Sequence, residues 1–126
     1  MNIQEALDLA DAMKPNMMTD QVKIAFLQEL DQKIWTEIVM THAHTAEQET
    51  MPEYDTDTDR GTELLVPDPY GTEMYPYWIM SKIDTLNQEI DKYNNDRAMF
   101  EHEYDEMSDW WNRTYMPVCR NRQIWI

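Results

Sequence analysis

The feature that most constrains the fold is a ladder of apolar side chains in the last third of the chain. Counting alternately four and three residues from Ile79 to Trp111, nine of ten positions are apolar or aromatic, and Arg97 is the exception. This a/d heptad spacing predicts a helix whose apolar stripe packs against other helices. The predicted seam consists of Ile79, Ile83, Leu86, Ile90, Tyr93, Phe100, Tyr104, Met107 and Trp111.

The ladder predicts one long helix from about Thr72 to Arg113, because its register continues across Asn94 and Asn95. At about 1.5 Å per residue, such a helix would be roughly 60 Å long. The alternative is a break at Asn94 that gives two stacked helices. Two shorter helices of the same subunit cannot cover so long a seam, so we expect neighbouring subunits to cover it.

Two amphipathic helices are predicted before the ladder. Asn2 and Glu5 have the spacing of a capping box in front of a helix that ends at Met13. Thr19 is placed to cap a second helix that runs to about Ala43.

The remaining sequence lacks a helical period. Residues 44–71 predict a long irregular connection, a feature that compact domains use mainly for function. The chain has only two glycines, which argues against a turn-rich β protein. We therefore expect an all-α bundle that forms one helical domain over residues 1–115, followed by an extended arm over residues 116–126.

Charge and composition exclude several classes of protein. The chain has 25 acidic and 10 basic residues, for a formal net charge of −15, whereas nucleic acids and anionic membranes are bound by clustered positive charge. Five Trp, seven Tyr and eleven Met argue against a disordered acidic tail. The single Cys119 excludes an intramolecular disulfide and a cysteine-based zinc cluster. No apolar run reaches the roughly 18 residues of a membrane helix, so we expect a soluble protein with no membrane partner.

The stretch DTDTDRGTELLV, from Asp55 to Val66, alternates acids as a calcium-binding loop does. An EF-hand loop needs glycine at position 6 and glutamate at position 12, where this chain has Arg60 and Val66. A solvated acidic loop is the better interpretation.

Other motifs for metal binding or catalysis are also missing from the sequence. His42 and His44 are two residues apart and do not share a helix face, and no nucleotide-binding or nucleophile motif is present. The sequence predicts no catalytic residue, no metal site and no cofactor, and hence no enzyme.

The C-terminal segment has the opposite charge to the body. From Trp111 onward there are three arginines and no acidic residue. Apolar anchors with arginines on a free end are typical of a peptide that docks onto a partner by strand addition or pocket insertion. The alternative is that this segment folds back on its own bundle. The predicted docking arm consists of Met116, Pro117, Val118, Arg120, Arg122, Ile124, Trp125 and Ile126.

Several segments together resemble the small head–tail connector proteins of tailed bacteriophages. These segments are EALDLADAMKPN, LDQKIWTEIV, LLVPDPY with the Tyr/Trp-rich stretch after it, EIDKYNND and WWNRTYMP, which together extend over roughly residues 2–117. The last residues, CRNRQIWI, have no counterpart in the pattern. The resemblance implies a mostly helical neck adaptor, or head completion protein, without catalytic residues.

The resemblance also implies where such a subunit works. It would form a ring of about twelve copies under the portal, after assembly in the host cytoplasm, and extend the DNA channel toward the next neck or tail-completion protein of the virion. Acidic faces suit a channel that lets DNA pass without binding it. The channel-facing candidates are Asp55, Asp57, Asp59, Asp84, Glu89, Asp91, Asp96, Glu103 and Asp105. The alternative function is a small acidic DNA mimic or inhibitor that binds a basic partner.

Overall fold

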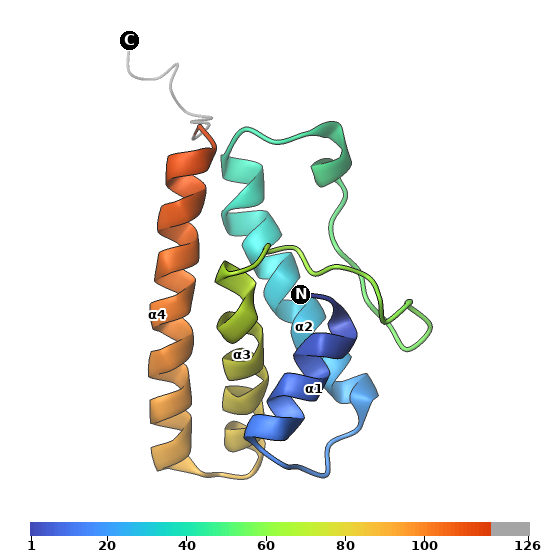
Figure 1. Ribbon diagram of the computed structural model, residues 1–126, viewed down its shortest axis with the longest axis vertical. Coiled ribbons are helices and arrows are strands. Elements are labelled where there is room, and N and C mark those ends of the chain that lie inside the picture. The colour runs from blue at the N-terminus through green and yellow to red at the C-terminus, as the bar shows by residue number, and fades with distance from the viewer. Residues whose placement is uncertain (117–126) are drawn as a thin grey trace.

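The computed structural model describes residues 1–116, which form an all-α bundle (Figure 1). Its four α-helices are α1 (Ile3–Met13), α2 (Asp20–Glu37), α3 (Tyr70–Leu86) and α4 (Ile90–Thr114), and two short 3-10 turns, η1 (Val39–Thr41) and η2 (Ala46–Glu49), lie between α2 and α3. The predicted all-α class is therefore confirmed for this part of the chain. Of the predicted docking arm, every residue after Met116 lies outside the described residues.

Local signals define the N-terminal half as expected. The Asn2 side chain accepts from the Glu5 N–H at 2.8 Å, and the Glu5 carboxylate accepts from the Asn2 N–H at 3.0 Å, which confirms the capping box of α1. Thr19 caps α2 by accepting from the Val22 N–H at 3.4 Å.

Helix α2 ends earlier than predicted, at Glu37 rather than near Ala43. The carbonyl of Ile38 accepts from the Thr41 hydroxyl at 2.9 Å and lies 2.7 Å from Nδ1 of His42. Such side-chain hydrogen bonds compete with the helical pattern, and here they accompany the change to the 3-10 turn η1.

The structure contradicts the prediction of a single long helix, because this region forms two helices, α3 and α4. The chain turns at residues 87–89, where Gln88 has a positive φ of 58°, and α4 runs back alongside α3 (Figure 1). The alternative break at Asn94 is wrong as well, because Asn94 lies inside α4. A heptad pattern is compatible with both arrangements, since it fixes which side of a helix is apolar and not where that helix ends. The hairpin lets the two halves of the seam cover each other.

The register of the hairpin pairs residues that are about equally far from the turn. Trp78 packs on Phe100 and Tyr70 on Trp110, each with ring centroids 5.0 Å apart. The one polar position of the ladder, Arg97, places its guanidinium 5.2 Å from the centre of the Trp78 ring, a cation–π contact. Arg97 therefore fits the apolar seam as a packing residue.

Most of the seam is covered within one subunit. Ile79, Ile83, Phe100, Met107 and Trp111 are buried in the core that α3 shares with the other helices. Tyr93 and Tyr104 are half-buried, and only Leu86 and Ile90, beside the turn, are largely exposed. Sister subunits are therefore not needed to cover the whole seam, contrary to the expectation from the sequence.

The connection between η1 and α3 is irregular, as predicted, and a buried carboxylate fastens it to the bundle. Asp31 accepts hydrogen bonds from the hydroxyls of Tyr54 at 2.5 Å and Tyr75 at 2.6 Å, and from the Leu65 N–H at 3.1 Å. Burial raises the pKa of Asp31, and these donors oppose the rise. Through these three hydrogen bonds, the buried carboxylate of Asp31 links α2 to α3 and to the connection.

Candidate functional site

One end of the bundle combines a cavity, buried charge and exposed apolar side chains. The α1–α2 connection and the α3–α4 turn lie together at this end (Figure 1), which we call the hairpin end. A cavity of about 590 Å³ opens there between the end of α1 and the start of α4, and its lining includes Met13, Lys14, Glu89, Asp91 and Asp96. The lining of this cavity therefore combines charged and apolar side chains.

Two of the acids predicted to face a DNA channel are instead buried at this end. Asp84 is fully buried and Asp96 is 6 % exposed. The antiparallel register of α3 and α4 places the two aspartates near enough for Asp84 to affect the pKa of Asp96. The Asp84 carboxylate accepts no well-aligned hydrogen bond, and its compensation is ionic, with Nζ of Lys14 2.7 Å from its Oδ1.

These contacts shift the pKa values of Asp96 and Lys14. Burial, followed by the nearby Asp84 carboxyl, raises the pKa of Asp96 to about 6. Lys14 is also 2.8 Å from the Glu89 carboxylate, and these ion pairs raise the pKa of Lys14 against the opposing effect of burial. Lys14 therefore faces Asp84, Glu89 and Asp96, and of these three acids Glu89 also pairs with Lys92.

The other predicted channel acids have mixed surroundings. Glu89 is half-buried and pairs with Lys14 and Lys92, and Glu103 is also half-buried. The acids that remain exposed are Asp55, Asp57, Asp59, Asp91 and Asp105. In the acidic loop, the Asp55 and Asp59 carboxylates accept hydrogen bonds from the N–H groups of Asp57 and Gly61 at 2.9 Å, so they stabilise their own turns.

Large apolar side chains are unusually exposed around the hairpin end. The exposed fractions are 42 % for Met13, 98 % for Met17, 56 % for Leu86 and 71 % for Ile90. We call these four residues the hairpin-end patch. Several large apolar side chains exposed at one end of a molecule are typical of a surface that another molecule covers.

The opposite end of the bundle carries an aromatic cluster where the predicted arm begins. Trp110 and Trp111 both pack against Tyr115, with ring centroids 6.1 and 5.2 Å away. The Ala43 N–H donates to the Met116 carbonyl at 2.7 Å, so the first arm residue is attached to the end of η1. Met116 itself is 76 % exposed. The last described residues of the chain are therefore held against an aromatic cluster.

Comparison with known proteins gives no family assignment. No family model, no curated protein and no solved structure matches this chain. Within residues 1–116, none of the helices combines the length and apolarity required to cross a lipid bilayer.

Sequence reasoning missed two groupings of charged residues. One is the set of Asp84, Asp96 and Lys14, which the fold of the hairpin and the end of α1 bring together. The other is a group of His102, Glu103 and Glu106 on α4. The spacing of His102 and Glu106, four residues apart on a helix, is a signal that could have been found in the sequence.

Proposed function

We propose that this chain is a structural adaptor subunit of the phage head–tail connector class, and that it works by docking at both of its ends. The observation that carries the proposal is the hairpin-end patch, because a protein that acts alone gains nothing by exposing four large apolar side chains. The basic arm begins about 37 Å away, at the other end of the 25-residue helix α4. The two docking surfaces are thus separated by the length of the subunit.

The occupant of the hairpin-end patch in this proposal is a second copy of the chain. Lys14 and Lys92 lie beside Glu89 and Asp91 at this end, so the surface carries both signs of charge around its apolar residues. Mixed charge of this kind suits contact with a like surface or with another part of the same protein better than contact with a uniformly charged partner. Repeated contacts between copies would close the ring of about twelve that the resemblance implies.

The remaining features have roles in the same proposal. The arm, with Arg120 and Arg122, would bind the portal protein, and the ring would then offer its other side to the next neck protein. Exposed acids such as Asp55, Asp57 and Asp105 would repel the DNA backbone and keep the channel free of specific binding. No chemical step is required of the subunit.

The proposal is tested by assembly onto the portal protein encoded by the same genome. Full-length protein should add to portals as a ring, measured as a mass increase of many subunits, and a chain that ends at Met116 should stay folded but fail to add. Normal assembly of the shortened chain would show that the arm does not bind the portal. A stable dimer that ignores portals but binds a basic enzyme would favour the acidic-mimic alternative.

The hairpin-end patch is tested by a separate variant. Leu86→Ser with Ile90→Ser should allow binding to the portal through the arm but prevent ring closure, so that few copies add per portal. The matched control is Val22→Ser, which changes an apolar side chain that is 37 % exposed on α2, outside the patch. Complete rings from the double variant would contradict the role of the patch.

A further inference from the structure

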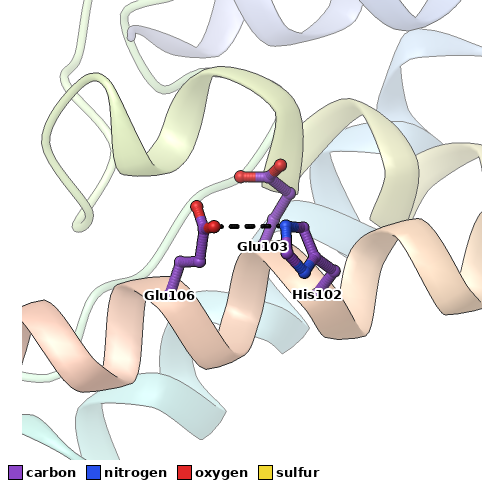
Figure 2. Close-up of side chains that lie close together, drawn as sticks. All are labelled: His102, Glu103 and Glu106. Carbon is purple, nitrogen blue, oxygen red and sulfur yellow. Dashed lines mark ion pairs between the residues drawn. The ribbon is translucent and has the colours of Figure 1, made fainter.

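Three side chains on α4 bring metal-ligating atoms together on the surface. Nε2 of His102 and Oε1 of Glu106 are 3.1 Å apart. One carboxylate oxygen of Glu103 completes the group, and the three ligand atoms all lie within 4.8 Å of one another. Figure 2 shows the three side chains projecting from the same part of α4, with the Glu103 side chain directed toward the neighbouring helix. Residues three and four apart face each other on a helix surface, so Glu106 lies beside both Glu103 and His102.

A third carboxylate approaches this group from the other half of the hairpin. Burial raises the pKa of Glu103, and the negative charge of Glu73 on α3, followed by that of Glu106, raises it further, while His102 opposes the rise. Among residues 1–116, no lysine or arginine forms an ion pair with any of these three glutamates. The fold therefore gathers three carboxylates beside His102, whose imidazole counters part of their charge when it is protonated.

We propose that His102, Glu103 and Glu106 bind a first-row divalent transition-metal ion such as Zn²⁺. An imidazole nitrogen with carboxylate oxygens suits these ions, whereas Mg²⁺ and Ca²⁺ favour sites made of oxygen alone. Two ligands of a tetrahedral zinc ion at about 2.0–2.1 Å lie roughly 3.3 Å apart, close to the 3.1 Å between His102 and Glu106. The ligand atom of Glu103 lies within 4.8 Å of the other two and would move closer to them when all three bind one ion.

Binding at this site has a structural consequence. The ion would neutralise the glutamates of α4 and reduce their repulsion with Glu73, so it would strengthen the contact between α3 and α4. Three protein ligands leave at least one coordination position for water or for a ligand from another molecule. This inference does not depend on the proposed adaptor function, and its test needs no portal protein.

The experiment is a titration of the full-length protein, purified without an affinity tag and freed of metal, with Co²⁺ and then Zn²⁺. Cobalt should give a saturable visible absorption band that added Zn²⁺ removes, and Zn²⁺ should raise the melting temperature. Metal affinity should fall at least tenfold in His102→Ala and in Glu106→Gln, because each loses a ligand. Equal concentrations of Mg²⁺ should not compete.

The chain offers a matched control for histidine variants. Nε2 of His44 is 3.6 Å from the Glu49 carboxylate, but no third ligand joins this pair in the part of the chain that is described. His44→Ala should therefore leave the cobalt band and the zinc affinity unchanged. The inference is overturned if the cobalt band is absent, or if His102→Ala binds zinc as tightly as the unchanged protein.

Discussion

The buried carboxyl pair at the hairpin end predicts that removing one negative charge stabilises the protein. Asp96→Asn keeps the shape of the side chain, removes the repulsion with Asp84, and supplies an N–H that can donate to the Asp84 carboxylate. The pKa of Asp96 lies at about 6 instead of 3.8. At about 1.36 kcal/mol per pKa unit, ionising Asp96 in the folded protein costs about 3 kcal/mol as an upper limit.

The sign of the pH dependence follows from proton binding. Between pH 3.8 and about 6, the folded chain holds a proton on Asp96 that the unfolded chain has released. Stability therefore falls as pH rises through this window, and the full cost is present above it. The substitution removes the cost, so Asp96→Asn should gain about 1–3 kcal/mol at pH 7.5 and almost nothing at pH 4.

Thermal unfolding followed by circular dichroism measures this effect. For a chain of this length, about 1 kcal/mol corresponds to roughly 4 °C, so we expect a melting temperature about 4–12 °C higher at pH 7.5. The control is Asp91→Asn, which removes the same charge from an exposed position in the same cavity and should change stability by less than about 0.5 kcal/mol. An equal gain at pH 4 and pH 7.5, or an equal gain in the control, would refute the reasoning.

Three further predictions concern packing and backbone geometry. Tyr75→Phe removes a hydrogen bond from the buried Asp31 and should lower the free energy of unfolding by about 1–3 kcal/mol in urea denaturation. Gly71→Ala should lower the melting temperature despite the better helix propensity of alanine, because the added Cβ would lie 2.8 Å from a backbone carbonyl oxygen. The control is Gly61→Ala, whose Cβ would have its nearest atom at 3.4 Å and which should leave the melting temperature nearly unchanged. Gln88→Gly should raise the free energy of unfolding by about 0.5–1 kcal/mol, since φ at this position is 58°, and an unchanged or lower value would contradict this interpretation of the turn.

Signals that act within a few residues were visible in the sequence. The capping box of Asn2 and Glu5, the Thr19 cap and the apolar period of each helix depend on neighbours within one or two turns. These signals determined that the described part of the chain is helical, and approximately where α1 and α2 begin. They could not show that α3 ends at Leu86, because the turn contains neither glycine nor proline and the apolar register continues through it.

The surroundings of the acidic residues were decided only by the tertiary structure. An aspartate in a helix is usually solvated, and nothing near Asp84 in the sequence indicates that it is buried beside Asp96 and Lys14. Lys14 is 70 residues away along the chain, and the carboxyl pair forms because the two helices of the hairpin are antiparallel. Glu73 meets Glu103 for the same reason.

The sequence by itself therefore determined the helical class, the acidic character and the apolar ladder of this protein. The tertiary structure decided that the two halves of the ladder pack against each other within one subunit. It also decided which residues are exposed at the turn and which charged side chains are buried. The physical reason is that helix periodicity is a local property, whereas burial depends on which distant segment lies across the interface.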